Sequence, residues 1–246
     1  PPPSSSSQAS TTLCCVTYND PSLVRTLTLN LRSASKPVPL VVVNAGSSAV
    51  DPLAFCGVAS TVTVVKGPKG RGQSHKTALS HVATDRCTFC HADTLLPPRW
   101  DLAVGAGFDA VAREPGCVAF GFRMSPGVPL GWTVDWAVWL RCKLFGLPYG
   151  DQCLSFRTEE FRSAGGYPEQ CLMEDIEVVD WYRSSPSSNE PAVAVFCLAG
   201  SLAALRAAGR ALAGEAPWLN FLCVSALCAA LACGGLLAGC NGVSVV

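Results

Sequence analysis

Two short acidic motifs carry the residue types best suited to chemistry. His91-Ala92-Asp93 follows a run of β-type residues, and Glu174-Asp175 opens a helix-like stretch. A carboxylate at a strand end suits a hard divalent cation such as Mg²⁺ or Mn²⁺, with a diphosphate and water as the other ligands. A second carboxylate suits removal of a proton from an attacking hydroxyl. Each motif alone is ordinary, because an Asp after a strand commonly caps a helix or closes a turn.

The segments that must position these motifs alternate between strand-like and helix-like patterns. The β-type runs are Leu13 to Tyr18, Val38 to Val43, Thr61 to Val65 and Arg86 to Cys90, and the helical runs between them are Pro21 to Leu31, Asp51 to Cys56 and Gln73 to Ala83. This alternation predicts βαβ units and an α/β fold with a mostly parallel, Rossmann-like sheet flanked by helices.

Polar segments follow each predicted strand, where ligands bind in such sheets. They are Asn19-Asp20, Asn44-Ala45-Gly46-Ser47, Lys66 to Arg71, and His91-Ala92-Asp93. We expect all four at one rim of the sheet.

The length of 246 residues suits one large domain rather than two. Residues 1–10 are rich in Pro and Ser and predict a flexible lead-in. Residues 11–200 form the predicted domain, and residues 201–246 form an apolar helical segment. Within that segment, Trp218 to Gly239 carries no charge and is long enough to cross a bilayer, although its many Ala, Gly and Cys residues favour a buried or interfacial helix equally well.

The second half of the domain is less regular. It contains a predicted strand at Cys117 to Met124, a tryptophan-rich helix from Trp132 to Phe145, and the polar motif Gly150-Asp151-Gln152. Trp132, Trp136 and Trp139 recur at helical spacing, which predicts a face packed in the core, with stacking on a sugar as the alternative.

Composition excludes some classes of partner and site. Lys plus Arg balance Asp plus Glu at 18 each, so no overall field favours nucleic acid. Most of the 14 cysteines stand singly in apolar runs, as Cys117, Cys142, Cys153 and Cys197 do, and we expect reduced core residues. The chain starts at Pro1 without a signal-peptide pattern, so its natural N-terminus and targeting signal are not visible; we expect a cytoplasmic or membrane-associated protein.

The order of several motifs resembles one known family. Phe89 to Pro97, Gly146 to Gln152, Gly165 to Pro168 and Leu172 to Asp175 together resemble the radical-SAM/selenodomain-associated group of family-two glycosyltransferases, from about Thr12 to Glu177. The resemblance implies a GT-A fold and an inverting transfer of a sugar from a nucleotide-diphosphate donor to an acceptor hydroxyl. It leaves the acceptor unknown, with a lipid-linked one among the alternatives, and membrane contact through residues 218–239 would suit it.

Roles follow from the resemblance position by position. It implies a divalent metal, Mg²⁺ or Mn²⁺, on Asp93 with His91 at the start of the same triplet, and Asp175 as the catalytic base beside Glu174. Donor binding falls to Asn44, Gly46, Ser47, Arg71 and Asp93, and Asp151 and Gln152 would face the acceptor or the sugar.

Two departures from the family pattern suggest an alternative. Asn44 stands where the family usually has Asp, and Ala203-Ala204-Leu205 stands where it has Arg-Arg-Trp, with Arg206 and Arg210 nearby. A catalytically impaired nucleotide-sugar-binding protein is therefore the second hypothesis. The third is a c-type haem protein, because Cys87, Cys90 and His91 match the haem-attachment motif.

Overall fold

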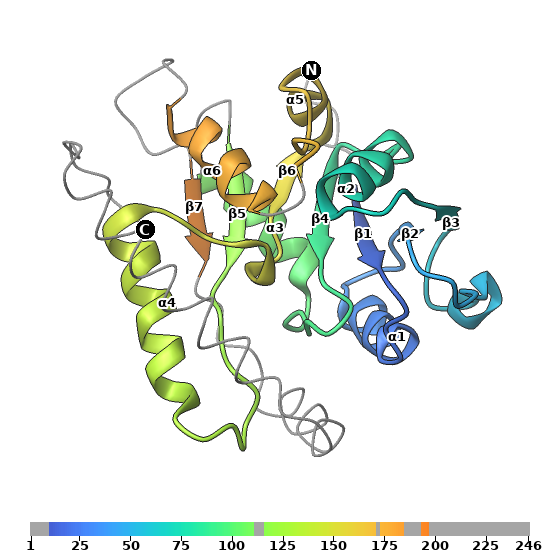
Figure 1. Ribbon diagram of the computed structural model, residues 1–246, viewed down its shortest axis with the longest axis horizontal. Helices are drawn as coiled ribbons and strands as arrows, with labels where there is room; N and C mark the ends of the chain where they lie inside the picture. Colours follow the sequence, from blue (N-terminus) through green and yellow to red (C-terminus); the bar gives the residue numbers. More distant parts are fainter. Residues whose placement is uncertain (1–9, 111–115, 171–172, 185–192, 197–246) are drawn as a thin grey trace, which may run out of the picture.

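A seven-stranded mixed sheet forms the centre of the computed structural model, which describes residues 10–110, 116–170, 173–184 and 193–196 (Figure 1). The strand order is β3-β2-β1-β4-β6-β5-β7. The strands are β1 (Thr11–Thr17), β2 (Leu40–Asn44), β3 (Val62–Lys66), β4 (Arg86–Cys90), β5 (Cys117–Phe120), β6 (Ser155–Arg157) and β7 (Val193–Phe196). Residues 1–9 of the predicted lead-in at 1–10, and the whole predicted segment at 201–246, lie outside the described residues.

The first four strands pair in parallel, as the alternation predicts. β1 pairs with both β2 and β4, and β2 pairs with β3. The connections are α1 (Leu23–Ser33), α2 (Arg71–Ser80) and, at the predicted Asp51 to Cys56 helix, a short 3₁₀ turn, η1 (Pro52–Phe55). Asp51 caps that turn by accepting a hydrogen bond from the Leu53 backbone at 2.9 Å. Because all four strands run the same way, their carboxyl ends and the polar segments after them lie on one rim.

The second half departs from simple alternation. β6 runs antiparallel to both β4 and β5, and β7 pairs in parallel with β5 at the edge. The other helices are α3 (Trp100–Ala110), α4 (Gly131–Phe145), α5 (Thr158–Ser163) and α6 (Glu174–Ser184), with a 3₁₀ turn η2 (Gly150–Gln152). The sequence patterns did not indicate α3, β6, α5 or β7. β6 has only three residues, too few for a periodic pattern to identify.

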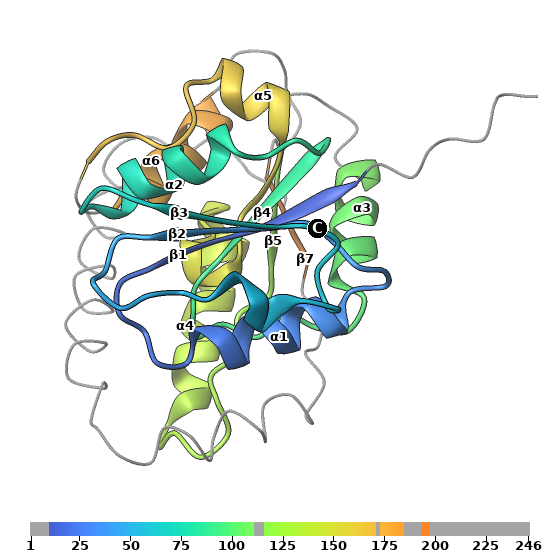
Figure 2. The ribbon, with the colours of Figure 1, turned by 90° about the vertical axis from the view of Figure 1, so that its right-hand side faces the viewer.

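Two apolar layers cover the sheet, with α2, α5 and α6 on one face and α1 and α3 on the other (Figure 2). Alternate residues of each strand enter opposite layers, so Cys14 packs toward α2 while Leu13 and Cys15 pack toward α1. The expectation of an α/β fold with a mostly parallel sheet flanked by helices is confirmed.

The tryptophan-rich helix forms as α4, but its tryptophans are not in the core. Trp132, Trp136 and Trp139 are 70%, 59% and 47% exposed, so the prediction of a packed face was wrong. The helix packs instead through the small residue Gly131 and through Val138 and Cys142. The error arose because residues of similar apolarity occupy both sides of the helix, so spacing alone did not identify the inner one.

The cysteines in the described part are all free thiols. Cys117, Cys142 and Cys153 are buried among apolar side chains, as expected, while Cys56 is exposed; Cys197 lies outside the described residues. In the same part of the chain, no helix combines the length and the apolar character needed to cross a bilayer.

Candidate active site

Three polar side chains from separate segments, an imidazole, a carboxylate and a guanidinium, meet at Gly150. A Cβ atom added to this glycine would lie 3.0 Å from Nε2 of His91, 3.3 Å from Oδ2 of Asp175 and 3.6 Å from Nη2 of Arg71. The Gly150 backbone N–H also donates to Oδ2 of Asp175 at 2.7 Å. Glycine leaves room for these groups, because the Cβ of another residue would be in tight contact with His91 and Asp175.

Arg71 links the strand-end segment to the start of α6. Its Nε lies 3.0 Å from Oε1 of Glu174, whose side chain is only 2% exposed, and Arg71 itself is half-exposed. The contact is an ion pair without hydrogen-bond geometry, so that Oε1 makes no hydrogen bond among the described residues. Burial raises the pKa of Glu174, and the Arg71 guanidinium counteracts part of that rise.

His91 lies next to Arg71 at the end of β4. The Nη2 of Arg71 and the Nε2 of His91 are 2.9 Å apart. Because a guanidinium only donates, Nε2 accepts, and the imidazole is neutral in this arrangement. Burial and then the Arg71 charge lower the pKa of His91, while Asp93 and Asp175 act in the opposite direction. The carboxylate of Asp93 is exposed two residues later, so of the two predicted cation ligands it is the one open to a ligand.

Asp151, the residue after Gly150, is half-buried, and one oxygen of its carboxylate is shielded from solvent. Its Oδ1 makes no hydrogen bond with described residues. Burial raises its pKa to about 6; Arg141 and Arg71 lower it, whereas Asp175 raises it further. Together Arg71, His91, Asp151, Glu174 and Asp175 make up what we term the charged cluster.

Gln152 has a positioning role in the structure. It is 2% exposed, its Nε2 donates to the Phe120 carbonyl at 2.8 Å, and its Oε1 accepts from Arg141 at 3.0 Å and from the Tyr149 backbone at 3.2 Å. Its amide is therefore engaged inside the protein, and its predicted contact with acceptor or sugar stays a prediction.

The segment predicted to bind the donor is held together by its own hydrogen bonds. The Asn44 Oδ1 accepts from the Gly46 backbone at 2.9 Å, and its Nδ2 donates to the Ser48 carbonyl at 2.6 Å. Oδ1 of Asn19 accepts from the Ser48 backbone at 2.8 Å and from the Ser47 hydroxyl at 3.4 Å. We call residues 44–48 the β2 loop. The side chains of Asn44 and Asn19 thus fix the conformation of this loop.

Two residues important for this arrangement were missed or undervalued. Arg141 packs its guanidinium 3.4 Å from the ring centroid of Tyr149 and also donates to Gln152. Nothing in its position within a tryptophan-rich helix indicated a link to the site. Asn19 adopts a left-handed backbone, with φ of 55°, which an Asn after a strand can signal.

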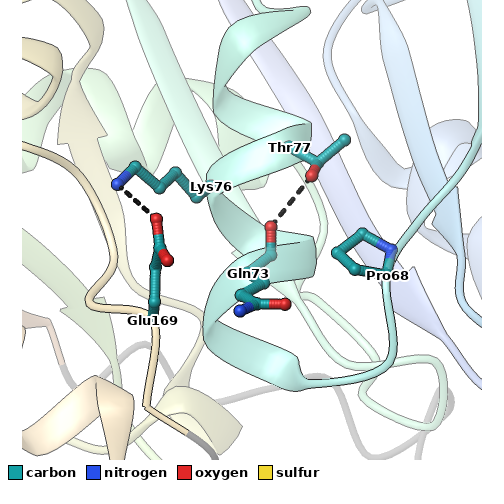
Figure 3. Close-up of a pocket in the computed structure, with 5 residues that line it drawn as sticks. All are labelled: Pro68, Gln73, Lys76, Thr77 and Glu169. Carbon is teal, nitrogen blue, oxygen red and sulfur yellow. Dashed lines mark hydrogen bonds and ion pairs between the residues drawn. The ribbon is translucent and has the colours of Figure 1, made fainter.

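A surface pocket of about 310 Å³ lies on the outer side of α2. Pro68, Gln73, Lys76, Thr77 and Glu169 line it, and the Lys76 to Glu169 ion pair of 3.0 Å closes one side (Figure 3). It holds none of the charged cluster, so we do not assign the chemistry to it.

The haem alternative does not fit the geometry. Cys87 and Cys90 are fully buried on β4 and face opposite layers of the core, so one porphyrin cannot reach both. Across the described ranges, no group of three or more His, Cys, Asp or Glu is arranged to hold a metal ion. A cation at Asp93 would therefore need oxygen ligands from a bound substrate, which Mg²⁺ commonly takes from phosphates.

Comparison with known proteins identifies the fold. No known protein-family model and no curated protein sequence matches the chain. A mannosyltransferase from Pyrobaculum calidifontis, solved with GDP-mannose and Mn²⁺, aligns over 80% of this chain and 56% of its own, with a TM-score of 0.56 and 18% identity. S. aureus TarS residues 1–349 align over 69% and 54%, with a TM-score of 0.52 and 15% identity.

A third solved structure also aligns with the chain. Glucosyl-3-phosphoglycerate synthase from Mycobacterium tuberculosis, solved with Mg²⁺ and UDP, aligns over 77% of this chain and 69% of its own, with a TM-score of 0.52 and 16% identity. The chain spans little more than half the length of the first two neighbours. At these identities the likeness concerns the fold, and the chain has the GT-A fold, with the charged cluster at the carboxyl ends of its central strands.

Proposed function

We propose that the chain is a glycosyltransferase that transfers a sugar from a nucleoside-diphosphate donor to an acceptor hydroxyl with inversion. The observation that carries the proposal is the convergence of His91, Arg71 and Asp175 on Gly150 at the rim of a GT-A sheet. The neighbours solved with GDP-mannose, UDP-GlcNAc and UDP support a nucleotide-sugar donor.

In this proposal Asp175 acts as the base. Its carboxylate takes the proton of the acceptor hydroxyl while the oxygen forms a bond to the anomeric carbon from the face opposite the diphosphate. The bond to the diphosphate breaks and its electron pair leaves with the phosphate oxygen. The Gly150 N–H holds Oδ2 of Asp175, and Oδ1 accepts from the Ile176 backbone at 3.0 Å, so the carboxylate is fixed before substrate binds.

The leaving diphosphate needs positive charge. The half-exposed guanidinium of Arg71 can donate to it with paired N–H groups. A bound Mg²⁺ or Mn²⁺ would add a divalent charge at the diphosphate, held by Asp93 with His91 beside it. The β2 loop, with Asn44, Gly46 and Ser47, would contact the nucleoside, and Asp151 would lie toward the sugar or the acceptor.

The test is nucleotide-dependent stabilisation of the protein. A thermal-shift panel of nucleoside diphosphates, with and without Mn²⁺, should show stabilisation by at least one nucleotide, about 2.7 kcal/mol at a concentration of a hundred times Kd. Asp93→Ala should abolish the metal-dependent part.

The matched control is Asp109→Ala, which removes an exposed carboxylate at the end of α3 and should leave the stabilisation unchanged. The proposal is wrong if no nucleotide stabilises the wild type in the presence of Mn²⁺.

A further inference from the structure

Helix α4 presents an apolar face to the outside of the molecule. Trp132, Trp136 and Trp139 follow one another at helical spacing on this face, with exposures of 70%, 59% and 47%. Leu130, just before the helix, and Leu144, near its end, are 68% and 58% exposed. We call the three tryptophans the tryptophan face, since Leu144, twelve residues after Trp132, lies on a different side of the helix. A patch of this kind on a soluble protein ordinarily marks an interaction site.

The other side of the same helix is already used by the fold. Gly131, Val138 and Cys142 are buried, and the last two join the core layer beneath α6. The helix is therefore apolar on two sides. A helix at a water-exposed protein surface instead has a polar outer side, and one that is apolar all round is covered by protein or lipid.

The charges of α4 do not offset the tryptophan face. Oδ1 of Asp135 accepts from the Met124 backbone at 2.6 Å, and Arg141 donates to the Leu147 carbonyl at 2.9 Å and to Gln152. Both charged groups are thus bound within the protein. The third charged residue of α4, Lys143, is exposed four residues after Trp139, on the same side of the helix, so it borders the tryptophan face at its C-terminal end.

We infer that the tryptophan face docks on the surface of a lipid bilayer. Tryptophan is the apolar side chain that concentrates at the membrane interface, where its ring is buried and its N–H remains hydrated. Exposure is greatest at Trp132 and falls along the helix, and the N-terminal end of α4 projects away from the sheet (Figures 1 and 2). The most exposed residue of the tryptophan face therefore lies at the projecting end of the helix.

The rest of the chain favours lipid over a second copy as the occupant. The 50 residues after Phe196 include Trp218 to Gly239, a stretch of 22 without a charged side chain. One bilayer would accommodate both that stretch and the tryptophan face, whereas a second copy would cover only the latter. The protein's net charge of zero also predicts binding that does not require anionic lipid.

Docking would place the charged cluster close to the bilayer. The 15 residues of α4 rise about 22 Å in all, and the helix ends just before Tyr149, on whose ring Arg141 packs, and Gly150. An acceptor carried by a lipid would then be presented near Asp175. The docking itself depends only on α4, so it stands or falls separately from the proposed transfer reaction.

The test uses the full chain labelled with 5-fluorotryptophan and mixed with phosphatidylcholine vesicles that contain a spin-labelled lipid. The ¹⁹F resonances of Trp132, Trp136 and Trp139 should broaden on vesicle addition. Those of Trp100, which is fully buried, and Trp181, which is 44% exposed on α6, should not. Single Trp→Phe substitutions assign the resonances.

A vesicle-flotation experiment provides the matched variants. Replacing all three α4 tryptophans with Ala should weaken the partition of the full chain into phosphatidylcholine vesicles by at least about tenfold, since binding scales with the apolar area buried. Trp181→Ala should change it less than about twofold. Circular dichroism and the Tm of each variant establish that the fold is retained, which the exposure of the three rings predicts.

Three outcomes would overturn the inference. One is broadening of the Trp218 resonance without change at the three α4 positions, which would show that the C-terminal segment alone meets lipid. Another is a concentration-dependent shift of the α4 resonances without vesicles, which would identify a second copy as the occupant. The last is binding only when phosphatidylglycerol is included, which would indicate attraction to charge rather than an apolar face.

Discussion

The β2 loop and the charged cluster lie on the same rim of the sheet, but they are stabilised in opposite ways. In the β2 loop, Asn44 and Asn19 satisfy backbone groups with neutral hydrogen bonds. In the charged cluster, buried oxygens of Asp151 and Glu174 have no hydrogen-bond donor among the described residues, and charge balance depends on Arg71.

The β2 loop is thus suited to recognising a shape, and the charged cluster to binding a ligand or a proton. A loop whose polar groups are satisfied holds one conformation at little electrostatic cost, which suits recognition of a flat nucleoside. A cluster of incompletely paired charges raises the free energy of the empty protein, and such clusters are common where a ligand or a proton is to be bound. Perturbing one group on each side should therefore give effects of different kind and size.

The largest expected effect is on turnover. Asp175→Asn removes the proposed base while an amide oxygen can still accept from the Gly150 N–H, so nucleotide binding should persist while turnover falls by roughly 10²–10⁴-fold. Donor hydrolysis, followed as release of nucleoside diphosphate, measures turnover without a known acceptor. Glu177→Gln, in the same first turn of α6, is the matched control and should retain activity.

Two results would contradict this assignment. Unchanged turnover in Asp175→Asn would move the base elsewhere, with Asp151 as the next carboxylate in the cluster. A wild type that binds nucleotide but never releases it as product, with any acceptor, would favour the catalytically impaired alternative.

Next in size is the effect of removing the charge that balances Glu174. Arg71→Met should destabilise the protein by about 2–3 kcal/mol at neutral pH, because it leaves a carboxylate that is 2% exposed without its ion pair. In the variant, burial without Arg71 raises the pKa of Glu174 further than in the wild type. The loss of stability should therefore shrink as the pH falls, because protonation of Glu174 removes the unpaired charge.

The matched control is Lys76→Met, which breaks an ion pair of the same 3.0 Å length between groups that are 48% and 61% exposed. Urea unfolding should show a change below about 0.5 kcal/mol for it. Equal losses in the two variants would mean that Glu174 is better solvated than its position indicates.

A smaller effect is expected from Asp151, and it depends on pH. The pKa of this carboxyl is about 6 in the folded protein, above its ordinary value, so the folded state binds the proton more tightly than the unfolded state. Stability should therefore fall as the pH rises from about 4 to 6 and stay lower above that range. Asp151→Asn, which cannot ionise, should exceed the wild type in stability by about 2 kcal/mol at pH 8, less than the roughly 3 kcal/mol that such a pKa shift implies for a fully buried carboxyl, and should match it near pH 4.

Unfolding at a series of pH values without nucleotide or metal measures this difference. A parallel pair of curves for wild type and Asp151→Asn would show that Arg141 and Arg71 already compensate the buried charge.

The sequence predicted the parallel half of the fold well and the other half poorly, for physical reasons. β1, β2 and β4 are largely buried and β3, at the edge of the sheet, is half-buried; all four read as apolar runs with turn residues between them, a signal within a few residues of each strand. β6 is a three-residue strand fixed by antiparallel pairing with β4, a contact 69 residues away for Cys87 and Phe156. No local pattern encodes such a pairing.

The candidate site was likewise predictable only in part. Strand-end position placed Asp93 and Arg71 in the polar segments of the rim, since topology brings strand ends together, and their roles came from the resemblance. The closeness of Gly150 to three polar groups, the internal hydrogen bonds of Gln152 and the outward tryptophans of α4 depend on how α4 and η2 pack, which periodicity does not report.

The smallest expected effect concerns the β2 loop. It tests Asn44, which stands where the resembled family usually has Asp. Asn44→Asp restores the residue usual in the resembled family, but a carboxylate cannot donate to the Ser48 carbonyl as the amide Nδ2 does. Losing that hydrogen bond and placing two acceptors together should cost about 1 kcal/mol of stability. Stability by urea unfolding and nucleotide affinity by thermal shift should then move in parallel. If the variant instead gains nucleotide affinity while losing stability, residue 44 contacts the donor directly, and the neutral network of the β2 loop would be a compromise between order and binding rather than a preformed recognition surface.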